Sequence, residues 1–182
     1  EIKLKDAISN LTKEAIKAAK NNKVFIILSD QNIKKDKLPI HALLATGAVH
    51  HALIKSGLRT SINIIVETAT ARDSHHCAAL IGYGATAIYP YLAYQSLNNM
   101  LINDSDDSKA DFFQATRNYR QGINKGLYKI LSKMGISTVS SYRGSQLFET
   151  IGLHQEVIDL CFCDTTNRLS GATFSDLSND QK

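Results

Sequence analysis

Asp30 and Glu67 are the acidic residues best placed to act on a substrate, because each stands at the end of a predicted strand. In a parallel sheet these strand ends share one rim, and barrel enzymes build their active sites on that rim. Two carboxylates there could serve as general acid and general base. The same carboxylates could instead pair with Arg59, Arg72 or Arg143 and hold loops together, and we favour this second interpretation.

The loop around Arg143 is the best candidate for binding an anion. Residues 136–141 are predicted as a strand, and a helix is predicted to begin at Ser145. Backbone amides and the helix dipole favour negative charge at such a junction. The donors would come from Arg143, Gly144, Ser145 and Gln146. The alternative is that Ser145 only caps the helix and that Arg143 pairs with a nearby acid.

Two histidine pairs, His50 with His51 and His75 with His76, raise the question of a metal site. Adjacent residues on a helix point about 100° apart, whereas helical zinc ligands are three or four residues apart. A site would need one histidine of each pair to converge, without a clear carboxylate or thiolate partner. We therefore predict no metal site and expect these imidazoles to bond to the backbone or to a neighbouring loop.

Other familiar catalytic patterns are missing or stand in the wrong order. Gly82 and Gly84 resemble part of a dinucleotide fingerprint, but they follow a predicted helix and precede a strand, the reverse of the genuine motif. The sequence has neither a nucleophile elbow nor a catalytic-cysteine signature. Cys161 and Cys163 are expected to be incidental buried thiols. We predict no catalytic residue in this chain.

The elements that must position these residues follow from apolar periodicity. Strands that are apolar on both faces are typical of parallel sheets covered by helices. Alternation of such strands with amphipathic helices predicts right-handed crossover units. The predicted class is therefore α/β, a parallel sheet of about four strands with crossover helices, resembling half of a TIM-like barrel. Strands are predicted at 24–29, 61–67, 85–89 and 136–141, and helices at 3–21, 39–56, 73–82, 112–134, from Ser145 and at 155–161.

Length and composition suit one globular domain. The 182 residues are 43% apolar and 21% charged, which is close to ordinary globular usage. We expect residues 1–165 to form a partial α/β domain, with a polar surface loop at 103–108. Residues 166–182 are expected to be a polar, poorly ordered tail. The chain opens with Glu1 and an immediate amphipathic helix, so we interpret it as a segment of a longer protein.

Charge and hydropathy exclude two classes of partner. The formal net charge of +4 is small and scattered, and its lysines mostly decorate a helix face, so no nucleic-acid surface is predicted. The sequence has no apolar run near the roughly 18 residues of a membrane span, and no signal peptide, so no membrane partner is predicted. Three cysteines without a disulfide pattern suit a reducing compartment, the cytoplasm or an organelle interior.

Several long motifs, covering about residues 24–170, resemble one family. They are LPIHALLATGAVHHALI, GLRT, VET, HHCAALIGYGATAIYPYLA, NKGLYKILSKMGIST and SYRGSQLFE, in this order. Together they resemble the large chain of glutamate synthase, at the end of the central domain that precedes the flavin barrel. Some positions depart from the family pattern: Gln31 stands in place of an arginine, Ala69 and Thr70 in place of Gly-Glu, and Thr86 in place of an aspartate.

The resemblance implies a parent enzyme that converts glutamine, 2-oxoglutarate and reductant into two glutamates, for ammonia assimilation. It implies FMN and an iron–sulfur cluster in the parent but no cofactor in this segment. The expected role is an interdomain scaffold between the amidotransferase and the FMN barrel, inactive alone, in the cytoplasm or in a plastid if ferredoxin is the donor. The alternative is an independent anion-binding half-barrel that uses the Arg143 loop. Because a half-barrel leaves strand edges exposed, we expect the isolated chain to self-associate.

Overall fold

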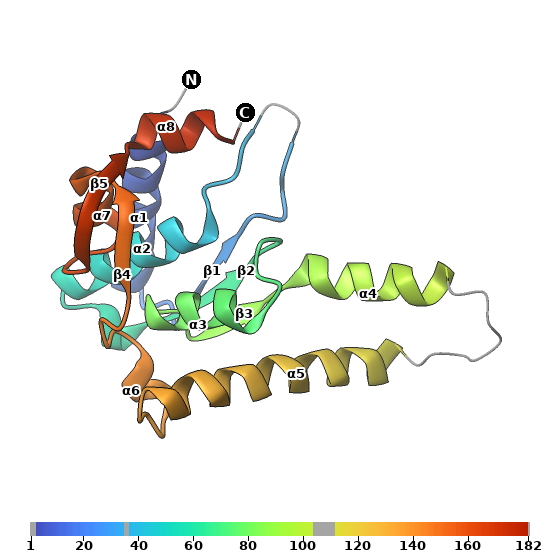
Figure 1. Ribbon diagram of the computed structural model, residues 1–182. Coiled ribbons are helices and arrows are strands. Elements are labelled where there is room, and N and C mark those ends of the chain that lie inside the picture. The colour runs from blue at the N-terminus through green and yellow to red at the C-terminus, as the bar shows by residue number, and fades with distance from the viewer. Residues whose placement is uncertain (1–2, 35–36, 104–111, 182) are drawn as a thin grey trace.

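The computed structural model describes residues 3–34, 37–103 and 112–181, and Figure 1 shows their arrangement. The predicted polar loop at 103–108 lies outside these residues, except for Asn103. The elements, in chain order, are α1 (Leu4–Lys20), β1 (Phe25–Ser29), α2 (Ala42–Lys55), the 3₁₀ helix η1 (Arg59–Ser61), β2 (Asn63–Glu67), α3 (Ser74–Gly82), β3 (Ala87–Tyr89), α4 (Tyr91–Asn103), α5 (Phe112–Lys133), α6 (Val139–Tyr142), β4 (Glu149–Leu153), α7 (Gln155–Cys161), β5 (Thr166–Ala172) and α8 (Phe174–Asn179).

The main sheet consists of β1, β2 and β3, all parallel, with β2 in the centre. Ser29 pairs with Glu67, and Glu67 pairs with Tyr89, so the three strands end on one rim. A second parallel sheet joins β4 to β5. The predicted α/β class with parallel strands is confirmed. Three strands rather than four share the main sheet, and neither sheet closes into a barrel.

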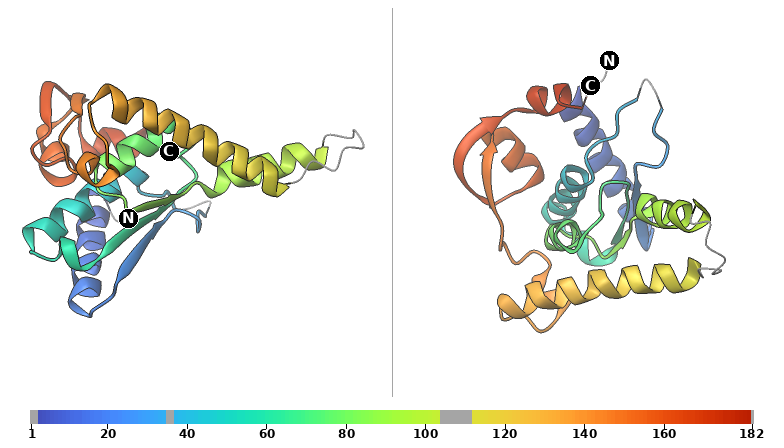
Figure 2. Two further views of the ribbon diagram at one scale, coloured as in Figure 1. Left: turned by 90° about the horizontal axis from the view of Figure 1, so that it is seen from below. Right: turned by 45° about the vertical axis from the view of Figure 1, so that its right-hand side comes forward.

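One face of the main sheet is covered by α1 and α2. Small side chains on α1 let this helix pack close to the sheet. The strands contact it through β-branched residues, which fit a pleated surface. The core on this side contains Ala15, Ala19, Val49, Leu53, Ile64 and Val66. The helix α2 is apolar on most sides because it also packs against α7, where a Cβ at Gly47 would overlap the Cys161 carbonyl. Figure 2 shows these helices stacked beside the sheet.

The opposite face of the main sheet, which we call the uncovered face, has the apolar residues Phe25, Ile27, Ile65, Ala87 and Tyr89 and, between and beside them, the polar residues Ser29, Asn63 and Glu67. The strand register places these residues side by side across β1, β2 and β3. Phe25 is 57% exposed and Ile27 is 55% exposed, although both belong to an apolar run. The described residues therefore bury one face of the sheet and leave much of the other in solvent.

The helices α4 and α5 form an arm that extends away from the main sheet, as Figure 1 and the left view of Figure 2 show. Tyr94 of α4 stacks on Tyr89 and meets Tyr119 of α5, with ring centroids 5.7 and 5.6 Å apart. At its other end α5 packs on α3, where a Cβ at Gly126 would overlap the Ser74 side chain. The helix predicted at 112–134 is confirmed. No helix among the described residues combines the length and apolarity needed to cross a bilayer.

The region after α5 differs from the sequence-based expectation. Residues 136–138 are irregular and 139–142 form the short helix α6, so the predicted fourth strand is wrong. The predicted helix from Ser145 is wrong as well, because β4 follows at Glu149 and pairs with β5. The pair encloses α7 in a second strand–helix–strand unit, and parallel pairing needs this kind of crossover.

The segment expected to be a polar tail, residues 166–182, contains β5 and α8. Thr173 and Asp176 form a reciprocal capping box that starts α8. Phe174 is buried against Ile8 and Val157, which brings the end of the chain back onto α1 and α7. This segment is polar because most of β5 is exposed to solvent. The helix α8 is held in place by one buried aromatic residue, Phe174.

Candidate functional site

The rim carboxylates Asp30 and Glu67 lie at the ends of β1 and β2, on the same edge of the sheet as expected. Asp30 accepts hydrogen bonds from Thr68 Oγ1 at 2.6 Å and from the Ala69 amide at 3.0 and 3.2 Å. Glu67 accepts one from the Ser29 hydroxyl. Ion pairs of these carboxylates with arginine were the favoured interpretation, but among the described residues neither makes one. Instead, Asp30 holds the loop that follows β2, and Glu67 links the end of β2 to the end of β1.

Tyr91 sits beneath this rim and is buried. Burial raises the pKa of its phenol to about 12, and a hydrogen bond with Asp30 and the charge of Glu67 act in the same direction. A phenol with so high a pKa keeps its proton at neutral pH. Tyr91 therefore serves as a fixed donor at the rim rather than as a base.

The loop of Arg143, Gly144, Ser145 and Gln146 lies between α6 and β4 instead of at a helix start. The Gly144 amide donates to the Gly82 carbonyl at 2.8 Å, and the Ser145 amide donates to the Tyr142 carbonyl at 3.3 Å. The Ser145 hydroxyl also donates to the Tyr142 carbonyl, at 2.6 Å. Gly144 and Gln146 have φ of 72° and 54°, the left-handed conformation of a tight turn. Two amides proposed as anion donors are therefore already bonded within the protein.

Two arginines and a histidine meet behind that loop. Arg59 donates to His50 Nδ1 at 2.9 Å, to the Ile62 carbonyl at 2.7 Å and to the Gly84 carbonyl at 2.8 Å. Burial lowers the pKa of His50 to about 4, and the nearby charges of Arg59, His51 and Arg143 contribute to the shift. Burial and Arg143 also lower the pKa of Arg59. Arg143 Nε is buried and has no hydrogen-bond partner in the described part of the chain.

The histidine pairs do not converge. His50 is buried and accepts from Arg59, whereas His76 accepts from the Arg72 amide at 3.3 Å and lies 3.4 Å from Asp73. Ring centroids within each pair are 5.2 and 6.5 Å apart, with interplanar angles of 74° and 53°. Residues 3–34, 37–103 and 112–181 include no group of three or more histidine, cysteine, aspartate or glutamate side chains that could hold a metal ion.

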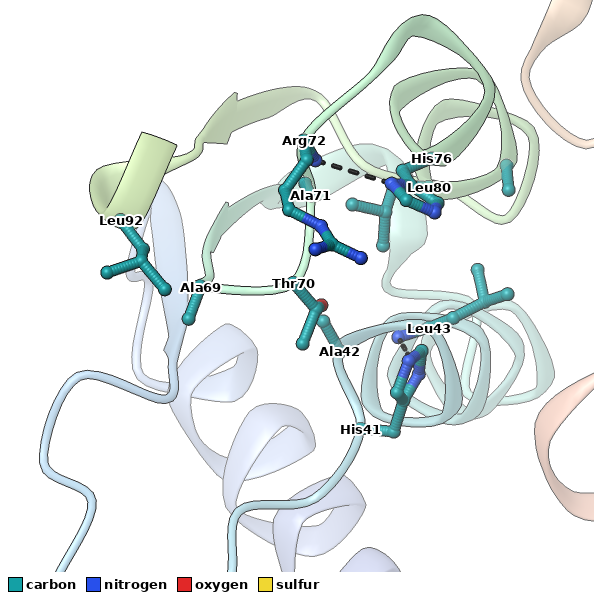
Figure 3. A pocket seen from close by; sticks show the side chains of 11 residues that line it. His41, Ala42, Leu43, Ala69, Thr70, Ala71, Arg72, His76, Leu80 and Leu92 are labelled. Atoms are coloured by element: carbon teal, nitrogen blue, oxygen red, sulfur yellow. Dashed lines mark hydrogen bonds between the residues drawn. The ribbon is translucent and has the colours of Figure 1, made fainter. Parts of the chain in front are cut away.

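A cavity of about 470 Å³ opens on the rim side of α2 and α3. Figure 3 shows its polar side chains: His41 from the start of α2, Thr70 and Arg72 from the loop after β2, and His76 from α3. The Arg72 guanidinium points into the space between Thr70 and His76. The remaining wall consists of alanine and leucine side chains.

Sequence reasoning did not bring His41, Arg72 and His76 together. From the sequence, Arg72 is a candidate partner for a carboxylate, and His76 is expected to bond to the backbone or to a neighbouring loop rather than to line a cavity. The available signal was positional, since His41 and Arg72 both lie in loops that follow strands ending on one rim. Such loops converge at the carboxyl edge of a parallel sheet.

Comparison with known proteins gives a consistent result along the whole chain. A family described as "Glutamate synthase central domain" matches residues 1–154. The NADH glutamate synthase of Schizosaccharomyces pombe is 38% identical over 174 residues, which are 96% of this chain and 8% of that protein. The NADPH glutamate synthase large chain of Bacillus subtilis is 41% identical over 97% of this chain and 12% of that protein. The chloroplastic ferredoxin-dependent glutamate synthase of Oryza sativa is 42% identical, with the same shares.

Solved structures support the fold. A flavocytochrome b2 mutant with pyruvate bound is similar to this chain with a TM-score of 0.57 and 13% identity, over 74% of this chain and 32% of that one. The shared architecture is TIM-barrel-like, although the sheets of this chain are small and open. This chain spans about a tenth of the length of the glutamate synthases that it matches. It belongs to the glutamate synthase central domain family.

Proposed function

We propose that this chain is a scaffold segment of a glutamate synthase, which connects the amidotransferase to the FMN-binding barrel of the same parent chain. The uncovered face carries this proposal. Ile27, Ile65 and Ala87 lie side by side across the three strands, with Phe25 and Tyr89 at opposite ends of the same face. Phe25, Ile27 and Tyr89 are each about half exposed. Exposed apolar surface of this kind marks a contact site. Since the matched relatives are far longer than this chain, further chain is available to cover that face.

The parent reaction would convert glutamine, 2-oxoglutarate and reductant into two glutamates, with FMN and an iron–sulfur cluster bound outside this segment. The electron donor would also be selected elsewhere. Relatives named for NADH, NADPH and ferredoxin are 38%, 41% and 42% identical to this chain. The sequence similarity of this segment therefore does not depend on the electron donor. The compartment would be the cytoplasm, or a plastid interior for a ferredoxin-dependent parent.

The anion-binding alternative at the Arg143 loop has weaker support. The Gly144 and Ser145 amides are bonded internally, and no helix begins at Ser145. One observation remains in its favour: Arg143 Nε is buried without a hydrogen-bond partner among the described residues. The charged groups that shift the pKa of Arg59 and of His50 are all basic, and none is a carboxylate. We propose that Arg143 pairs with a carboxylate of the parent chain rather than with a diffusible anion.

A chimera tests the scaffold role. The 182 residues would replace the matching segment of the Bacillus subtilis large chain, and glutamate formation from glutamine and 2-oxoglutarate would be measured. We expect activity in the chimera, and a loss of about tenfold or more when Phe25 and Ile27 are both changed to lysine, because buried charge opposes docking. The matched control changes Lys13 and Lys17, exposed on α1, to glutamate and should retain activity.

Full activity and unchanged thermal stability in the Phe25→Lys/Ile27→Lys chimera would contradict the scaffold proposal. Self-association of the isolated chain provides a second test. Its uncovered face and the open edges of the sheet should promote self-association, which light scattering over a concentration series would detect. The same two lysine substitutions should return the isolated chain toward a monomer.

A further inference from the structure

The cavity between α2, α3 and the loop after β2 has the volume and lining of a small-molecule site. Its volume of about 470 Å³ lies within the range of about 300–1,000 Å³ that is usual for ligand pockets. Apolar side chains such as Leu43, Leu80 and Leu92 form most of its wall. A few polar groups converge on it from three separate elements (Figure 3). This combination is typical of pockets that hold an organic body and orient one polar head.

The polar groups of the cavity are hydrogen-bond donors. Among the described residues, the Arg72 guanidinium has no hydrogen-bond or ion-pair partner, so its donors are available to a ligand. Of the residues that the structure describes, those that line the cavity include no carboxylate side chain. Arginine presents a planar fork that matches a carboxylate or phosphate with two parallel bonds. The charge expected of a ligand head is therefore negative.

The two histidines of the cavity also favour a negatively charged ligand head. His41 Nδ1 accepts from the Leu43 amide at 3.3 Å, so the hydrogen of the neutral ring lies on Nε2. His76 Nδ1 either accepts from the Arg72 amide or, when protonated, pairs with Asp73 at 3.4 Å, and both arrangements leave a hydrogen on Nε2. Both rings line the cavity as donors. The starts of α2 and α3 add the positive ends of two helix dipoles.

Two acidic residues near the cavity favour a ligand head with one negative charge over a head with two. Asp73 caps α3 through the His76 amide at 2.9 Å, and Asp30 is close enough to oppose the lowering of the His41 pKa. These two charges lie outside the cavity wall and repel additional negative charge. A single permanent positive charge, on the Arg72 guanidinium, suits a monoanion better than a phosphate dianion.

We propose that the cavity formed by His41, Thr70, Arg72 and His76 binds a small organic carboxylate. Arg72 holds the carboxylate head, the histidines and the Thr70 hydroxyl complete its hydrogen bonds, and the alanine and leucine side chains enclose the body. The site is separate from the Arg143 loop and from the uncovered face. It does not depend on the scaffold role.

Calorimetry on the 182-residue chain tests the proposal with three probes: 4-phenylbutanoate, its neutral amide and inorganic phosphate. We expect the acid to bind at least about tenfold more tightly than the amide, because a charge-assisted bond is lost in the amide. Phosphate should bind more weakly than the acid. Arg72→Gln should weaken binding of the acid about tenfold or more, and Arg72→Lys should restore part of it.

Arg117→Gln provides the matched control, since Arg117 is exposed on α5 and does not line the cavity. This variant should bind the acid as the unchanged chain does, and thermal melting would verify that all variants fold. Equal affinity for acid and amide, or unchanged binding by Arg72→Gln, would overturn the proposal. Tighter binding of phosphate than of the acid would overturn the assignment to a carboxylate.

Discussion

Both faces of the main sheet have large apolar side chains, but one face is buried by helices and the other is exposed. Ile64 and Val66 on the covered face are fully buried, whereas Phe25 and Ile27 on the uncovered face are more than half exposed. Both sets come from uninterrupted apolar runs, which are typical of strands covered on both sides. The difference indicates that the fold of this chain is secured by one face, while the other face retains apolar surface for contacts beyond the chain.

The largest expected effect comes from truncating one residue on each face. Ile64→Ala should lower the free energy of unfolding by about 2–5 kcal/mol, because it leaves a cavity in a packed core. Ile27→Ala should change it by about 0.5 kcal/mol or less, because exposed side chains lose little on truncation. Urea unfolding of both variants measures the contrast. Equal losses would mean that the uncovered face is packed in solution.

Burial on the covered side also predicts a dependence on pH. The pKa of His50 is about 4 in the folded chain and 6.5 in the unfolded chain. Below pH 6.5 the His50 side chain is therefore protonated in the unfolded chain but stays neutral in the folded chain until the pH approaches 4. Stability is therefore complete above pH 6.5 and falls as the pH drops toward 4, by about 1–3 kcal/mol for this group. Burial lowers the pKa of His41 and His51 as well, which adds to the same trend.

Urea unfolding at pH 7, 6, 5 and 4.5 would follow this loss, and His50→Gln gives the comparison. Glutamine retains an acceptor for Arg59 but does not titrate, so the variant should lose stability less steeply over this range. Parallel pH profiles for the two proteins would contradict the assignment of the loss to His50.

A last contrast concerns two glycines of α5: Gly126, whose position contacts α3, and Gly122, which has open space around it. Gly126→Ala should lower the free energy of unfolding by about 1–3 kcal/mol, because the new methyl group overlaps Ser74. Gly122→Ala meets nothing nearby and should raise it by up to about 1 kcal/mol, since alanine is the better helix former. Thermal melting of the two variants would show opposite shifts. Shifts of the same sign would contradict the packing of α5 on α3.

The first half of the fold could be predicted because each apolar run is local and clearly bounded. The runs at 24–29 and 61–67 contain β1 and β2, and Gly57 ends the helix before the second. The region after α5 could not be predicted in the same way. Residues 136–141 have strand-forming side chains, but 136–138 are irregular and α6 begins at Val139. The Thr138, Ser140 and Ser141 hydroxyls bond one another at this junction. The strand β4 depends on a partner, β5, that follows a whole helix later.

The same distinction applies to the candidate sites. Asp30 and Glu67 could be placed on one rim because strand ends are visible in the sequence. Their partners could not, since Thr68 and Ala69 become donors only when the loop after β2 folds back on Asp30. The cavity depends on loops from two separate strand–helix units. Its residues carry no common motif and meet only through the parallel register of the sheet.

Arg59 joins three segments of the chain, and this has an evolutionary consequence. Its three bonds reach His50 on α2, the Ile62 carbonyl before β2 and the Gly84 carbonyl before β3. Gly84 has φ of 114°, and a Cβ there would collide with the His50 ring. Replacement at 50, 59 or 84 therefore changes what the other two positions can tolerate, and such effects are not additive. These three positions are expected to be inherited as a unit, and to vary together or not at all among descendants of this sequence.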